Sequence, residues 1–187
     1  MDKFVRVMYG NRSHAGGFEY KIGQVNETDN FNPKAENPKD LGGFNFSTES
    51  KILRWILRGD TLYDVEIPSD AEVVETENKN APHGVFVTNK IILSNPRLID
   101  DDLALELYLK SDLPVNSYFQ CLTFLSLRNF KKVCERILLD KVNKDNAEDA
   151  FQTFSTFWKV NEEDRTDCYK EVWNRLMEIK NEWKRFL

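Results

Sequence analysis

Apolar and polar residues alternate along several short stretches of the first half of the chain. Alternation with a period of two is typical of strands that have one buried face, and it is clearest at residues 4–9 and 18–22. Apolar runs bounded by turn residues mark further strands at 44–46, 61–67, 71–75 and 85–93. The pattern predicts a small, mostly antiparallel sheet of five or six strands.

One helix is predicted within this strand-rich half. Thr48 is suited to cap it, Glu49 falls in its first turn, and Gly59 follows its apolar face as a stop signal. A polar stretch at 26–40 precedes this region and contains two prolines. Long loops without a function are uncommon, so we expect an extended surface loop there.

The second half has the 3.6-residue period of helices. It predicts five of them, at about 100–111, 115–127, 129–142, 146–158 and 162–186. The last has the clearest apolar stripe, formed by Tyr169, Val172, Trp173, Leu176, Ile179, Trp183 and Phe186. The leucines at 103, 105, 107 and 109 alternate as in a strand, but the acidic residues before them and Ala104 favour a helix.

Glycine and proline divide the chain into two parts. All eight glycines fall at or before Gly84 and all six prolines at or before Pro114, and both residue types mark turns and break helices. We therefore expect an α+β fold, with a β-rich module that contains one helix at 1–95 and an all-α helical domain at 96–187.

Composition limits the classes of function. The chain has 41% hydrophobic residues, enough for a packed core, and a net charge of −5 from 26 basic and 31 acidic side chains. Nucleic-acid binding depends on Lys and Arg, so the charge argues against it. No apolar run is long enough to span a membrane, and the first residues lack a secretory signal, so we expect a cytoplasmic protein.

Residues suited to metal binding or catalysis are few. Cys121, Cys134 and Cys168 form no CxxC pair and are odd in number, which favours buried core thiols over disulfides or a zinc site. The two histidines, His14 and His83, each lie in a loop near glycine and give no redundant catalytic or metal cluster. We expect neither a metal nor a cofactor.

A run of acidic residues contains no Lys or Arg. Its members are Asp60, Asp64, Glu66, Asp70, Glu72, Glu75 and Glu77. The run could bind a basic partner or imitate the phosphates of a nucleic acid. A solvated sheet face is the favoured interpretation, because charged residues ordinarily lie at the surface.

The order of motifs in the first half resembles the N-terminal module of giant-virus ankyrin-repeat proteins and of related uncharacterised phage proteins. The motifs are GFEYKIG at 17–23, FNP at 31–33, GGFNFST at 42–48, VEIPSDA at 65–71 and KIIL at 90–93. The resemblance covers about residues 3 to 95, and no ankyrin repeats follow. It implies a viral source, with no chemistry attached to the module.

A fainter resemblance is to the ADP-ribosyltransferase fold. Arg6 matches the Arg of the first strand, and Ser47 and Thr48 partly match the Ser-Thr-Ser strand end, where this chain has Glu49 as the third residue. Lys90 lies where the family carries its catalytic Glu. The resemblance implies a degenerate pocket lined by Arg6, Ser47, Thr48 and Lys90.

Three functions follow from these observations. The first is a viral accessory protein that binds a host or viral protein and could counter a host defence system. The alternative from the second resemblance is an ADP-ribosyltransferase-like enzyme or nucleotide binder, with activity doubtful without the Glu. The acidic run supports a third alternative, a nucleic-acid mimic.

Overall fold

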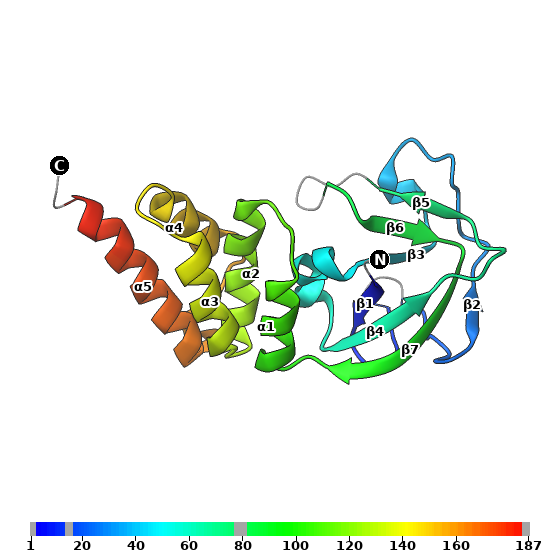
Figure 1. Ribbon diagram of the computed structural model, residues 1–187, viewed down its shortest axis with the longest axis horizontal. Helices are drawn as coiled ribbons and strands as arrows, with labels where there is room; N and C mark the ends of the chain where they lie inside the picture. Colours follow the sequence, from blue (N-terminus) through cyan, green and yellow to red (C-terminus); the bar gives the residue numbers. More distant parts are fainter. Residues whose placement is uncertain (1–2, 14–16, 77–81, 185–187) are drawn as a thin grey trace. The chain divides into compact units, whose positions relative to one another are not determined.

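The computed structural model describes residues 3–13, 17–76 and 82–184. The chain has an α+β fold with two compact units (Figure 1). The sheet unit comprises Met1–Ile99 together with Lys110–Asp112, and the helical unit comprises Asp100–Leu109 together with Leu113–Leu187. Asn95 and Pro96, where glycine and proline usage predicts the boundary, lie inside the last strand.

The sheet has seven strands, with every pairing antiparallel, in the order β2-β7-β4-β1-β3-β6-β5. Their bounds are β1 Phe4–Met8, β2 Val25–Glu27, β3 Phe44–Thr48, β4 Thr61–Glu66, β5 Val73–Glu75, β6 Val85–Thr88 and β7 Lys90–Leu98. Strands β6 and β7 are joined through one residue, although β4, β1 and β3 lie between them in the order. The sheet must therefore curl strongly (Figure 1).

The curled sheet encloses one core. The buried side chains of Met8, Tyr20, Phe44, Phe46, Tyr63, Ile91 and Leu93 form it. The strand predicted at 18–22 is wrong, because this segment makes only an isolated bridge between Arg12 and Glu19. Its aromatic alternation reflects packing instead, since the Tyr20 ring lies 4.8 Å from that of Phe18 and 5.3 Å from that of Phe44.

The loop predicted at 26–40 begins too early. Residues 25–27 form β2, and the side chain of Asn26 is only 4% exposed. Its Oδ1 accepts a hydrogen bond from the Lys21 backbone N–H at 2.8 Å, and its Nδ2 donates to the Lys21 carbonyl oxygen at 3.0 Å. A polar residue can be buried when its groups are paired in this way, and a polarity pattern does not reveal it. A short 3₁₀ turn, η1, follows at Pro38–Asp40.

The helix predicted after Thr48 is present, but it is the 3₁₀ helix η2, Glu49–Arg58. It packs against β1 and β3 through Ile52, Leu53 and Ile56, all 2% exposed or less. Spacings of three and four residues fit both a 3₁₀ and an α-helix, so the sequence pattern could not distinguish them. Gly59 ends the helix where a Cβ would lie 2.1 Å from the carbonyl carbon of Met8.

The helical unit contains α1 Asp101–Leu109, α2 Val115–Leu127, α3 Lys131–Lys141, α4 Ala147–Thr156, η3 Glu162–Asp164 and α5 Asp167–Lys184. The five predicted helices are confirmed, except that the last begins later because η3 is a separate turn. The ambiguous leucine segment is helical. Leu107 is fully buried whereas Leu109 is 61% exposed, which a strand with both on one face would not produce.

An aromatic cluster formed by Phe151, Phe154, Tyr169 and Trp173 joins α4 to α5. The Phe154 ring lies 4.7 Å from that of Tyr169, and the Phe151 ring lies 4.9 Å from that of Trp173. The predicted apolar stripe of α5 is therefore docked along Tyr169, Val172 and Leu176. The side chain of Trp183, and Phe186, lie outside the described residues.

Candidate functional site

Arg6 lies half-buried on β1, beside the Tyr20 ring of the sheet core. Its guanidinium carbon lies 4.9 Å from the centre of the Tyr20 ring, and its Nη1 donates a hydrogen bond to the carbonyl oxygen of Asn45. Burial lowers the pKa of Arg6, which the nearby Tyr20 partly offsets. These contacts tie β1 to β3 and to the segment that carries Tyr20.

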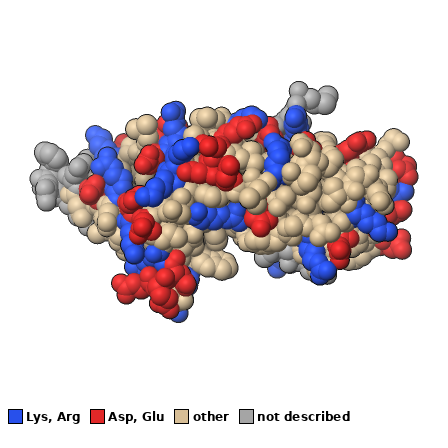
Figure 2. Space-filling model, turned by 90° about the horizontal axis from the view of Figure 1, so that it is seen from below, with Lys and Arg blue, Asp and Glu red and all other residues tan. Residues whose placement is uncertain are grey.

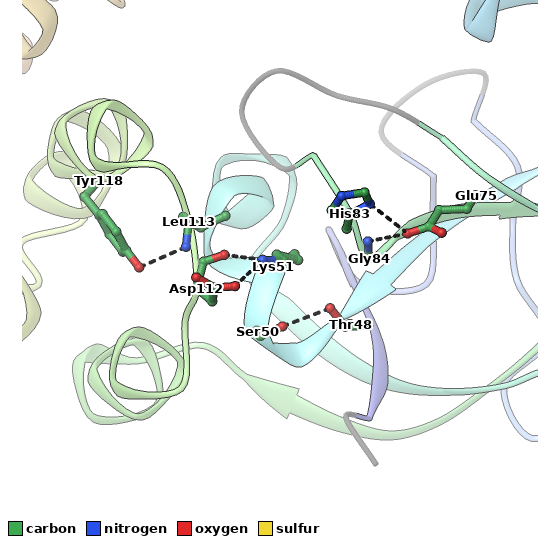
Figure 3. A network of polar contacts seen from close by, with 9 residues as sticks. All are labelled: Thr48, Ser50, Lys51, Glu75, His83, Gly84, Asp112, Leu113 and Tyr118. Carbon is green, nitrogen blue, oxygen red and sulfur yellow. Dashed lines mark hydrogen bonds and ion pairs between the residues drawn. The ribbon is translucent and has the colours of Figure 1, made fainter.

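The other three residues of the predicted pocket are not gathered around Arg6. Ser47 pairs with Val5, one residue before Arg6, so it points to the opposite face of the sheet, and it is 1% exposed. Thr48 shares the face of Arg6, but its Oγ1 lies 3.1 Å from the Ser50 Oγ (Figure 3).

Lys90 is held by two carboxylates. Its Nζ lies 2.6 Å from Asp70 Oδ2 and 3.1 Å from Glu27 Oε1. The hydrogen bonds to Asp70 and Glu27 raise the pKa of Lys90 and keep it charged, and the same contact lowers the pKa of Asp70. The ammonium of Lys90 is thus neutralised within the sheet unit instead of facing a pocket shared with Arg6 and Ser47.

The acidic run does not present a continuous row of unpaired carboxylates. Asp64 accepts from Arg97 Nη2 at 2.8 Å, Asp60 accepts from Thr61 Oγ1 at 2.9 Å, and Asp70 pairs with Lys90. The remaining described members, Glu66, Glu72 and Glu75, are exposed. Glu77 lies outside the described residues.

Glu75 has a local structural role. Its Oε1 accepts from the Gly84 backbone N–H at 2.8 Å and lies 4.0 Å from His83 Nδ1 (Figure 3). His83 is exposed, and His14 lies outside the described residues. In the described part of the chain, no three His, Cys, Asp or Glu side chains are placed to hold a metal ion.

Two buried charges of η2 are paired with the short segment 110–112. Lys51 Nζ lies 2.8 Å from Asp112 Oδ2 and also donates to the Asp112 carbonyl oxygen (Figure 3). Glu49 Oε2 lies 3.1 Å from Lys110 Nζ. The side chains of Lys51 and Glu49 are each 11% exposed, so these partners supply the compensation that buried charges require. The pairs explain why 110–112 belongs to the sheet unit.

A groove of about 600 Å³ runs between α3 and α5 of the helical unit. Its apolar lining comes from Leu138, Leu139, Val142, Val172 and Ile179. Val172 is buried, whereas Leu139 is 77% exposed, the most exposed of the large apolar side chains among the described residues. We call this groove, with Leu139 at its edge, the α3–α5 site.

Three of the four charged residues that line the groove, Lys131, Glu171 and Arg175, form ion pairs. Lys131 Nζ lies 2.7 Å from Glu171 Oε1, which joins α3 to α5, and Arg175 Nη1 lies 3.1 Å from Glu178 Oε2. The hydrogen bond to Glu171 raises the pKa of Lys131. Figure 2 shows basic and acidic side chains interspersed over much of the face in view, with one compact acidic group at its lower left edge. The site is therefore apolar, with basic and acidic side chains mixed along its border.

Comparison with known proteins gives no further guide. No protein-family model, no curated protein and no solved structure matches this chain. The α3–α5 site does not stand out in the sequence pattern. One signal was present, because Leu139 lies two residues after buried Ile137 and so falls on the opposite side of the helix.

Proposed function

We propose that this chain is a viral accessory protein that binds a host or viral protein through the α3–α5 site and thereby counters a host defence system. The observation that carries the binding role is Leu139, 77% exposed at the edge of an apolar groove. Apolar patches beside polar borders are typical of protein interaction sites. The viral setting rests on the resemblance of the first half.

The lining of the groove favours a protein over a small molecule. Small-molecule sites bury most of their ligand and use a few converging polar groups to orient it. Here three of the four charged groups are committed to ion pairs, as in the pair of Lys131 with Glu171. A leucine that projects outward adds contact area to a flat or convex partner rather than enclosing a ligand.

The other two functions have less support. An ADP-ribosyltransferase-like pocket would need Arg6, Ser47, Thr48 and Lys90 on one surface, yet Arg6 and Ser47 point to opposite faces. A nucleic-acid mimic would need exposed carboxylates without counterions, yet Asp64 and Asp70 are paired. In the part of the chain that the structure describes, none of the helices could span a membrane.

The test compares two matched substitutions. Leu139→Glu places a charge at the proposed site, and Leu98→Glu does the same at a leucine on β7 that is 72% exposed. Both positions are at the surface, so the free energy of unfolding of each variant should lie within about 0.5 kcal/mol of the wild-type value. Wild type and both variants are used to capture proteins from infected-cell lysate, and the captured protein is then purified and its footprint mapped by hydrogen exchange.

We expect one partner to be retained by wild type and Leu98→Glu and lost by Leu139→Glu. Its footprint should protect amides of α3 and α5. Equal capture by all three, or a footprint confined to the sheet unit, would refute the proposal.

A further inference from the structure

The two walls of the groove present side chains at helical spacing. On α5, steps of four, three and four positions separate the lining residues Cys168, Val172, Arg175 and Ile179. On α3 and the residue that follows it, the same steps separate Lys131, Glu135, Leu138 and Val142. The lining therefore extends for about 16 Å along each wall, which is about three turns of a helix.

The starts of the two helices lie at the same end of the groove. Lys131 Nζ, in the first turn of α3, lies 2.7 Å from Glu171 Oε1, in the second turn of α5. Cys134 and Val172 line the groove but are only 1% and 2% exposed, so they form its floor. Leu139, at 77% exposed, stands at its edge. The groove is thus a trough between two helices, with an apolar floor and a projecting leucine.

An extended peptide would find few partners for its backbone in this trough. The backbone groups of both walls are used within the helices themselves, and Lys131, Glu171 and Arg175 are engaged in ion pairs. Buried backbone groups without a partner cost free energy, and extended peptides ordinarily bind to sheet edges, which supply these hydrogen bonds. A helix satisfies its own backbone, so the trough fits a third helix better than a strand.

One charge of the groove is available to a partner. Glu135 is exposed and, within the described ranges, has neither an ion pair nor a side-chain hydrogen bond. It precedes Leu139 by four residues, so the two side chains lie one turn apart on the same face of α3. A helix that packs an apolar side chain on Leu139 can therefore place a cation beside Glu135. The net charge of −5 also favours a basic partner over an acidic one.

We propose that the segment bound by the α3–α5 site is an amphipathic α-helix of about three turns, with apolar side chains on one face and a Lys or Arg beside them. Its apolar face covers the floor of the trough and Leu139, and its cation pairs with Glu135. This inference rests on the proposed binding function and names the chemistry of the partner. Apolar anchors at steps of three and four residues are the means by which a helix is recognised in a groove.

The test uses three synthetic peptides of about 14 residues, long enough for three turns. The first carries leucines at helical spacing on one face and a lysine beside them, among alanine and glutamine. The second has glutamate in place of the lysine. The third is the first with a proline at its centre, which breaks a helix but is tolerated in an extended chain. Affinity is measured by fluorescence anisotropy of labelled peptide, and helix content by circular dichroism.

We expect the lysine peptide to bind the full-length chain and to gain helix on binding, since a free peptide of this length is only marginally helical. The proline peptide should bind at least about tenfold more weakly. Leu139→Glu should weaken binding of the lysine peptide by at least about tenfold, because it places a charge against an apolar face.

A charge exchange tests the role of Glu135. Glu135→Lys should weaken binding of the lysine peptide by about fivefold and strengthen binding of the glutamate peptide by a similar factor. Glu72→Lys is the matched control, because it makes the same change of charge at an exposed position in the sheet unit, and it should leave both affinities within about twofold of wild type. An equal effect of the two variants would show that net charge, and not Glu135, selects the peptide.

Three results would overturn the proposal. They are absence of binding by the lysine peptide, equal binding of the proline peptide, and binding without a gain of helix. A dimer of the chain alone in sedimentation, lost in Leu139→Glu, would instead assign the trough to a second copy. Because these tests use synthetic peptides, they can fail while the captured partner still maps to α3 and α5, so they are separate from the test of the proposed function.

Discussion

Removal of the Phe154 ring should be among the most destabilising changes in the helical unit. Phe154 is 0% exposed and lies at the centre of the aromatic cluster, 4.7 Å from the Tyr169 ring and 6.4 Å from the Trp173 ring. Truncation of a buried Phe to Ala costs about 3–5 kcal/mol through lost burial and the cavity left behind. Loss of two ring pairs, each worth about 0.5–1.5 kcal/mol, favours the upper part of that range.

We therefore expect Phe154→Ala to lower the free energy of unfolding by about 4 kcal/mol. The melting temperature of a unit of this size should fall by about 15–30 °C. The assay is equilibrium urea unfolding followed by far-ultraviolet circular dichroism. Trp158→Ala is the matched control, because Trp158 is 55% exposed and its ring packs against Phe124 at 5.7 Å. This variant should lower the free energy of unfolding by about 1 kcal/mol or less.

Two results would refute this reasoning. If Phe154→Ala lowers the free energy of unfolding by less than about 1 kcal/mol, and the slope of that free energy with urea concentration is unchanged, the aromatic cluster is not packed in the native state. If Trp158→Ala lowers the free energy of unfolding as much as Phe154→Ala does, exposure and ring contacts do not determine the loss of stability.

Three further predictions concern charge, chemistry and close packing. The pKa of Asp140 is lowered by hydrogen bonds from Arg136 and then Tyr108, so the charged carboxylate stabilises the fold above its ordinary pKa of about 3.9, and this stabilisation is lost as pH falls through the lowered value. Tyr108→Phe should reduce the fall in the urea midpoint between neutral and acidic pH, and an unchanged fall would contradict this prediction. The purified protein should release no nicotinamide from NAD, because Arg6 and Ser47 point to opposite faces of the sheet and Lys90 pairs with Asp70 and Glu27, so no pocket is assembled to stabilise the positive charge that develops on the ribose; turnover measured by chromatography would disprove it. Gly59→Ala should cost about 1–3 kcal/mol in urea unfolding, since its Cβ would overlap the backbone of β1 at 2.1 Å, and wild-type stability would show that this backbone moves freely.

The sequence predicted best those elements whose pattern reflects one packed face. The stripe of α5 is an example, because Tyr169, Val172 and Leu176 are all 2% exposed or less. It failed at 18–22, where alternating aromatic residues pack on the sheet without pairing as a strand. The 3₁₀ form of η2 was equally hidden, since its buried positions suit either helix.

The α3–α5 site could not be predicted from local patterns. Cys134 and Cys168 both line the groove although they are 34 positions apart in the sequence, so their placement there depends on the packing of two helices. The pocket of Arg6, Ser47, Thr48 and Lys90 shows the converse. Those residues were grouped by resemblance, while strand register directs Arg6 and Ser47 to opposite faces.

The pairing of η2 with residues 110–112 determines where this chain can be divided. A fragment that ends at Ile99 contains every strand but lacks the partners of Glu49 and Lys51, which lie on Lys110 and Asp112. A fragment that ends at Asp112 carries α1 as a tether and keeps both pairs. The chain passes from the sheet unit into the helical unit at residue 100, returns to the sheet unit for residues 110–112 and then re-enters the helical unit. A single cut therefore cannot separate the two units, and a protein that contains one complete unit would need its two chain segments joined by a new linker.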